Sequence, residues 1–157
     1  MMVAIAEPVA DAVISVDLLR AAGRSESFPK AWTDEKRRRA LDRYEKFLRL
    51  AARYPDTRLA PCRDIDEFWH LHMLHPVAYA RDCGRLFGAL LDHDGGFGKA
   101  PDEEPVLISV WTETARLFKL EYREEYREAN DGAESGATNC WHDCQSRCWH
   151  ECSSKSK

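Results

Sequence analysis

Residues 64–98 read DIDEFWHLHMLHPVAYARDCGRLFGALLDHDGGFG and contain four of the six histidines in the chain. Pro76 suits the first residue of a helix, and it disfavours helical geometry for His75 before it. The stretch therefore predicts two helices that meet at a sharp joint. Asp64 and Glu67 have the spacing of a capping box, which predicts that the first of these helices begins at Asp64.

Apolar residues at helical spacing predict three more helices outside this stretch. One follows Pro8 and ends at Gly23, and a second begins after a Thr33 cap and stops before Pro55. The last runs from about residue 105 to residue 128, and the glycines at 95 and 96 should end the helix that begins at Pro76. No segment alternates as a strand. The predicted fold is all-α, an irregular bundle of about five helices with a flexible Cys/His-rich C-terminal tail.

The composition narrows the class of protein and its partners. The chain has 157 residues, 44% of them hydrophobic and 32% charged, which suits one soluble globular domain. Its net charge of -4 argues against nucleic acid as a partner, because phosphate binding needs a basic face. No apolar run approaches the ~20 residues that cross a bilayer, and Glu7 and Asp11 interrupt any signal peptide. We therefore expect a cytoplasmic protein with no membrane partner, whose cysteines are reduced or bind metal.

The composition changes at residue 131. Residues 1–130 form the predicted helical domain, and residues 131–157 form a linker and a Cys/His-rich tail. Six soft or borderline metal ligands lie within 13 residues of this tail: Cys140, His142, Cys144, Cys148, His150 and Cys152. On one straight helix the outer two cysteines would be ~18 Å apart, too far to share an ion. The tail is expected to fold back, to bind more than one ion, or to serve as thiols.

The central stretch and the preceding RYEKFLRLAARYPDTRLAP at residues 43–61 together resemble the glycine-rich domain-containing protein family. The resemblance covers roughly residues 41–98 and extends to the short bacterial members and to the repeated module of the plant proteins. It implies a helical domain, and members often end in a Gly-rich or Cys-rich tail. This chain has the cysteines without the glycines. The matching positions are Asp66, Trp69, His70, His72, Pro76, Tyr79, Asp82, Cys83, Gly88 and His93.

The histidines of the central stretch are candidate metal ligands. Asp66 and His70 share one helix face because they are four residues apart, whereas His72 lies ~200° round the helix from His70. His70 and His72 could share an ion only if the helix bent or ended between them. His93 could instead complete a site with Asp66 and His70, and such donors suit zinc or iron. In the alternative interpretation, Asp66 holds His70 by a hydrogen bond and no ion is bound.

A catalytic alternative would pair the thiol of Cys83 with His70 or His93, with Asp82 orienting the imidazole. Because Cys83 also has the helical spacing of a buried core residue, we assign no catalytic residues. The predicted function is metal binding or metal handling, with zinc or copper(I) as the ion. Two alternatives remain open. The chain could be a precursor or carrier whose tail is changed by a modifying enzyme, or a non-catalytic module that binds a protein partner.

Overall fold

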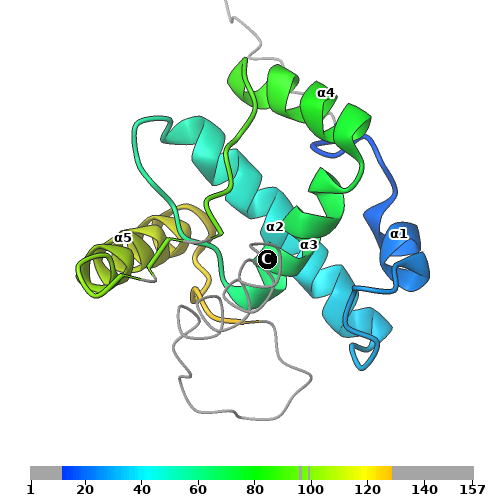
Figure 1. Ribbon diagram of the computed structural model, residues 1–157, viewed down its shortest axis with the longest axis horizontal. Coiled ribbons are helices and arrows are strands. Elements are labelled where there is room, and N and C mark those ends of the chain that lie inside the picture. The colour runs from blue at the N-terminus through cyan, green and yellow to red at the C-terminus, as the bar shows by residue number, and fades with distance from the viewer. Residues whose placement is uncertain (1–11, 96, 99, 129–157) are drawn as a thin grey trace, which may run out of the picture.

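The computed structural model describes residues 12–95, 97–98 and 100–128 (Figure 1). These residues form helices and no strand, which confirms the predicted all-α class with about five helices. None of the described helices combines the length and apolar character that a membrane crossing requires. The linker and the Cys/His-rich tail lie outside the described residues. The helices are α1 (Leu18–Arg24), α2 (Asp34–Arg53), α3 (Arg63–Met73), α4 (Pro76–Phe87) and α5 (Glu104–Tyr122).

The long helix α2 is the centre of the fold, and each of the other four helices contacts it. Figure 1 shows it running through the middle of the molecule, between α5 on one side and α1 on the other. Thr33 caps its start as predicted, because the Thr33 hydroxyl accepts a hydrogen bond from the backbone N–H of Lys36 at 3.1 Å. The helix ends just before Pro55. Its buried side chains are Ala40, Arg43, Tyr44, Phe47, Leu48, Leu50 and Ala51.

The predicted joint between α3 and α4 is confirmed. Pro76 is the first residue of α4, and His75 before it has a φ of -109° and a ψ of 73°, outside the helical range. The predicted capping box is wrong, because the cap of α3 is Cys62 and Asp64 lies inside the helix. Asp64 is fully buried, and its carboxylate accepts a hydrogen bond from Arg43 Nε at 2.7 Å. Asp64 therefore joins α3 to α2.

The first predicted helix is shorter than expected, since residues 12–17 are not helical and α1 begins at Leu18. Asp17 is its cap, and its side chain accepts a hydrogen bond from the N–H of Arg20 at 3.0 Å. The segment before it packs elsewhere: the Ser15 N–H donates to Asp82 on α4 at 2.8 Å. Gly23 lies within α1 rather than after it.

Helices α4 and α5 also end earlier than predicted. Gly88, with a φ of 73°, follows α4 in the left-handed conformation that glycine adopts easily, so the chain leaves the helix before the predicted glycine pair. Helix α5 ends at Tyr122, because Arg123 after it adopts the left-handed conformation with a φ of 56°, and Tyr126 beyond it is buried in the core. There the hydroxyl of Tyr126 donates to Ala60 O at 2.6 Å and accepts from the N–H of Cys62 at 3.2 Å.

Candidate metal centre

Loop residues 88–95, which follow α4, return along α3 and bring His93 to it. Trp69 Nε1 on α3 donates a hydrogen bond to the Tyr79 hydroxyl on α4 at 2.9 Å. That hydroxyl in turn donates to Leu91 O at 2.5 Å. The His93 ring then packs edge-on to Trp69, with ring centroids 4.4 Å apart. The hydrogen bond to Leu91 holds the loop two residues before His93, and the contact with Trp69 holds the His93 ring.

Asp66, His70 and His93 converge on one point, as one of the sequence hypotheses required. His93 Nε2 lies 2.6 Å from Asp66 Oδ1 and 3.1 Å from His70 Nε2, and the third separation, from His70 Nε2 to Asp66 Oδ1, is 3.5 Å. The side chains of Asp66 and His93 are 6% and 8% exposed, and that of His70 is 29% exposed. The group is thus buried on one side and open to solvent on the other.

Two separate two-centre hydrogen bonds cannot account for both short contacts of His93. A ring nitrogen presents either one proton or one lone pair in the ring plane, and an ionised carboxylate only accepts. If His93 Nε2 donates to Asp66, it has no lone pair left for His70. If His93 Nε2 instead accepts a hydrogen bond from His70, it carries no proton to donate to Asp66. Its lone pair then faces a lone pair of the carboxylate. Either arrangement satisfies only one of the two contacts.

A metal ion would satisfy all three atoms, because each would donate a lone pair to it. Zinc lies ~2.0–2.2 Å from imidazole nitrogen and carboxylate oxygen, which places its donors roughly 3.0–3.4 Å apart in octahedral or tetrahedral geometry. The three separations, 2.6, 3.1 and 3.5 Å, scatter around that range. The residues therefore fit one face of a metal's coordination sphere, with at least one position left for another ligand.

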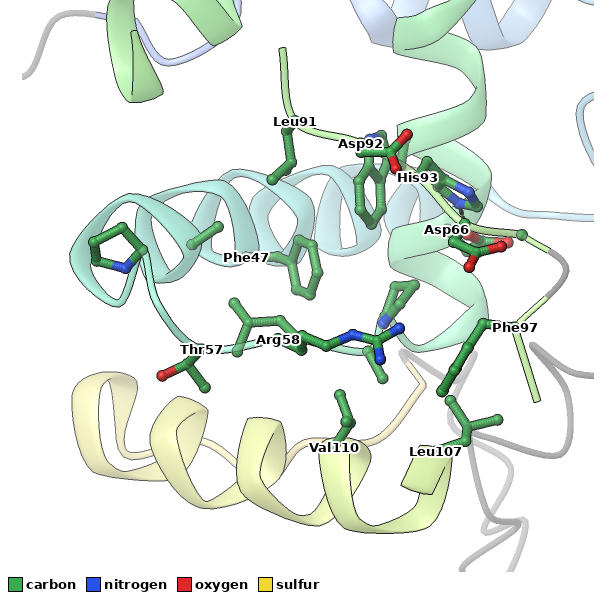
Figure 2. A pocket seen from close by; sticks show the side chains of 18 residues that line it. Phe47, Thr57, Arg58, Asp66, Leu91, Asp92, His93, Phe97, Leu107 and Val110 are labelled. Atoms are coloured by element: carbon green, nitrogen blue, oxygen red, sulfur yellow. Dashed lines mark hydrogen bonds and ion pairs between the residues drawn. The ribbon is translucent and has the colours of Figure 1, made fainter. Parts of the chain in front are cut away.

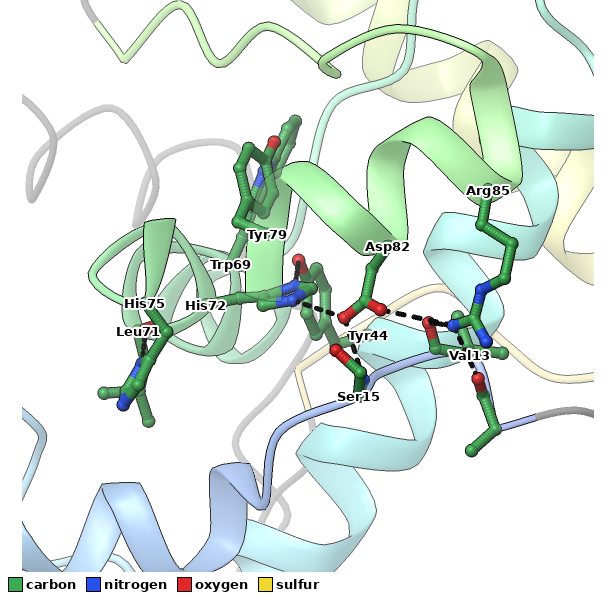
Figure 3. A network of polar contacts seen from close by, with 11 residues as sticks. Val13, Ser15, Tyr44, Trp69, Leu71, His72, His75, Tyr79, Asp82 and Arg85 are labelled. Carbon is green, nitrogen blue, oxygen red and sulfur yellow. Dashed lines mark hydrogen bonds and ion pairs between the residues drawn. The ribbon is translucent and has the colours of Figure 1, made fainter. Parts of the chain in front are cut away.

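His72, the fourth predicted ligand of the helical domain, lies outside this group. Its Nε2 is 3.0 Å from Asp82 Oδ2 and its Nδ1 is 2.9 Å from the Tyr44 hydroxyl (Figure 3). Because an ionised Asp82 can only accept, Nε2 carries the proton and Nδ1 accepts from Tyr44. Burial lowers the pKa of His72, against the opposing effect of Asp82, so the ring is neutral. His72 is a structural histidine in the core.

The same network ties the first described residues to α4. The two oxygens of Asp82 accept from the Ser15 N–H at 2.8 Å and from Arg85 at 3.2 Å. Arg85 also donates to the carbonyl of Val13 at 2.9 Å. Asp82 thus orients His72, not the His70 or His93 that the catalytic alternative required. Cys83 is 1% exposed and belongs to the core, as expected of a small buried cysteine.

A cavity of about 410 Å³ adjoins the candidate metal centre, and Asp66 and His93 form part of its wall (Figure 2). Most of the lining residues are apolar, and they come from α2, the segment between α2 and α3, α3, α5 and the loop after α4. Figure 2 shows Arg58 extending across the cavity between Phe47 and Val110. Its guanidinium lies 4.1 Å from the centroid of the Phe97 ring. The cavity places an apolar space and a cation beside Asp66 and His93.

Sequence reasoning missed this cavity and its polar residues. Arg58 lies in the irregular segment between α2 and α3, where no periodicity shows the direction of a side chain. Asp92 and Asp94 flank His93 and also line the cavity. The acidic residues on both sides of His93 were the sequence signal that could have indicated them as site residues. The six predicted ligands of the tail, from Cys140 to Cys152, lie outside the described residues.

Comparison with known proteins confirms the resemblance. Residues 5–82 match the family model described as glycine-rich domain-containing protein-like. The chain is 41% identical over 59 residues to glycine-rich domain-containing protein 1 of Arabidopsis thaliana, which is 35% of this chain and 7% of that protein. It is also 37% identical over 97 residues to glycine-rich domain-containing protein 2 of Arabidopsis thaliana. That match covers 52% of this chain and 12% of that protein. The chain thus spans only a small part of either relative.

No solved structure gives a significant match to the chain. The family match begins before residue 41, where the predicted resemblance began, and it stops at residue 82 before His93. Two of the three converging residues, Asp66 and His70, lie within the matched range. Residues 5–82 therefore carry a glycine-rich domain-containing protein-like domain.

Proposed function

We propose that this protein binds a metal ion through Asp66, His70 and His93. The observation that carries the proposal is the double contact of His93 Nε2, which lies 2.6 Å from a carboxylate oxygen and 3.1 Å from a second imidazole nitrogen. Two imidazoles and one carboxylate are borderline and hard donors. They favour zinc, or iron(II) in the same coordination, over copper(I), which prefers sulfur.

Such a site holds its ion by three protein ligands. Zinc sites with a purely structural role usually have four protein ligands, whereas three protein ligands leave a position for water or a small molecule. Because two of the three residues line a cavity, that position can serve to hold a ligand. We assign the domain a metal-dependent binding role and no catalytic residue.

The Cys/His-rich tail is proposed as a second, separate metal-binding unit. Four thiols with two imidazoles suit zinc or copper(I), and thiolate is the donor that copper(I) prefers. The proposal of a metal-handling protein rests on the two units together, because they offer different donors to different ions. The tail residues are Cys140, His142, Cys144, Cys148, His150 and Cys152.

The metal content and the intact mass of the same purified protein test this function. Metal-handling predicts at least one equivalent of zinc, iron or copper with an unchanged covalent mass. A covalent mass change on the tail with no metal would instead support a precursor or carrier for a modifying enzyme. Unmodified protein without metal, after zinc and copper(I) have been offered under reducing conditions, would contradict the proposal and leave an interaction module.

A further inference from the structure

We propose that the cavity beside the metal centre binds a small, mostly apolar molecule that carries a single carboxylate. This inference rests on the proposed metal site and names the ligand of its open position. The carboxylate would complete the coordination of the ion, and the apolar body would lie in the cavity. The inference goes beyond metal binding because it assigns the domain a class of organic ligand.

The position of the three metal ligands supports this arrangement. Asp66 and His93 are part of the cavity wall, whereas His70 is not. An ion bound to all three would therefore lie at the edge of the cavity, with its cavity side next to Asp66 and His93. A molecule inside the cavity could reach it without displacing a protein ligand. Figure 2 shows the two side chains together at one end of the cavity.

The cavity suits the body of a small molecule. Its volume of about 410 Å³ falls within the range of roughly 300–1,000 Å³ that is usual for small-molecule sites. Large apolar side chains from α2, α3, α5 and the loop line it, and α2 packs against both α3 and α5. Burial of an apolar ligand against them would be favourable. These side chains are Phe47, Trp69, Leu91, Leu107 and Val110.

The charges around the cavity favour one negative charge on the ligand. A divalent ion and the Arg58 guanidinium attract an anion, and both would repel a protonated amine. Asp92 and Asp94 also line the cavity and add to the charge of Asp66. A dianion such as phosphate would meet more of this repulsion than a carboxylate does. A monocarboxylate adds a single negative charge, which the ion and Arg58 both attract.

The test uses the full-length chain with Cys140, Cys144, Cys148 and Cys152 replaced by serine, so that the tail thiols do not bind the probe metal. The protein is loaded with cobalt(II), whose visible absorption reports changes in its coordination. We expect 4-phenylbutanoate to change this spectrum saturably. Acetate should bind at least tenfold more weakly because it lacks the apolar body, and 4-phenylbutan-1-ol should leave the spectrum unchanged.

Two variants test the cavity itself. Arg58→Gln should weaken 4-phenylbutanoate binding about tenfold, whereas Arg81→Gln, an exposed arginine on α4 away from the cavity, should not. Val110→Trp should fill the cavity and abolish binding of the carboxylate while the cobalt spectrum and the helical circular dichroism stay unchanged. Each of these losses supports the assignment of the carboxylate to the cavity.

Three results would overturn the inference. Cobalt bound through His93 with no response to 4-phenylbutanoate would refute the carboxylate ligand and leave the metal site intact. Unchanged binding of the carboxylate in Val110→Trp would show that it reaches the ion from solvent. If the protein binds no cobalt at all, the metal site itself fails, and the inference fails with it.

Discussion

The Nε2 atoms of His70 and His93 lie 3.1 Å apart, although 23 positions separate the two residues in the chain. The approach depends on Tyr79, whose hydroxyl links Trp69 on α3 to the carbonyl of Leu91 in the loop. The sharp joint before Pro76 makes this possible, because it lets α4 fold back so that the loop after it returns to α3. The convergence of His70 and His93 is therefore a consequence of the joint.

Tyr79→Phe should weaken metal binding at this centre about tenfold or more, as loss of a supporting hydrogen bond around metal ligands typically does. The change removes the hydrogen bonds to Leu91 O and from Trp69 Nε1 but keeps the ring in the core. Tyr54→Phe is a matched control, since the Tyr54 hydroxyl donates to Glu121 at 2.6 Å, away from the centre. Titration of zinc into the two variants, both with the four tail cysteines replaced by serine, measures the difference. Equal affinities would show that the hydroxyl does not position His93.

Asp64→Ser distinguishes a buried ion pair from a helix cap. Serine is a good capping residue, so a capping role predicts little change in stability. The structure instead pairs Asp64 with Arg43, which is itself buried and lies against the rings of both Phe118 and Tyr126. Removal of one partner of a buried pair costs about 3–5 kcal/mol. Urea unfolding measures the loss, with the exposed Asp34→Ser as the control, and a loss below about 1 kcal/mol would favour the cap.

The boundary of the helical domain can be tested by truncation. A chain that ends at Gly132 should keep the helical content of the whole chain and its thermal midpoint to within ~5 °C. A chain that ends at Arg123 should melt at least ~5 °C lower, because it loses Tyr126, which is 4% exposed and bonded to Ala60 and Cys62. Thermal circular dichroism gives both values. A large drop for the longer chain would mean that the tail stabilises the domain.

The tail should bind copper(I) as two weak two-coordinate sites. On a helix its four cysteines would fall on a stripe of ~120°, and neighbours such as Cys140 and Cys144 are close enough to clamp one ion. A reduced peptide of residues 139–152 should take up nearly two copper(I) ions, and Cys144→Ser should remove about one. Binding should weaken as the pH falls, because protons compete for the thiolates. A single tight zinc ion on all four sulfurs would contradict this helical arrangement.

Local sequence signals correctly predicted those helix ends that are decided by residues close by in the chain. Thr33 as a cap, Pro55 as a stop and Pro76 as a first residue were each correct, because backbone geometry and a single side chain decide them. Asp64 was misinterpreted because the same carboxylate can cap a helix or pair with a distant arginine. The spacing of residues along one helix does not show Arg43 on another.

The candidate metal centre was predictable in its residues but not in its geometry. The i, i+4 spacing placed Asp66 and His70 on one face and separated His72 from them, as the structure shows. The position of His93 depends on the loop after Gly88, where no periodicity applies. The cavity with Arg58 needs three helices and two loops in place, so it follows only from the tertiary fold.

The most direct test of the metal centre is X-ray absorption at the zinc edge on the full-length chain with the four tail cysteines replaced by serine. We predict one zinc per chain, with only nitrogen and oxygen neighbours at ~2.0–2.2 Å and an imidazole scattering pattern. His93→Ala should abolish the bound zinc, and His75→Ala, whose ring bonds Leu71 O instead, should retain it. The account would be contradicted if the protein that keeps His93 contained no more zinc than the His93→Ala variant.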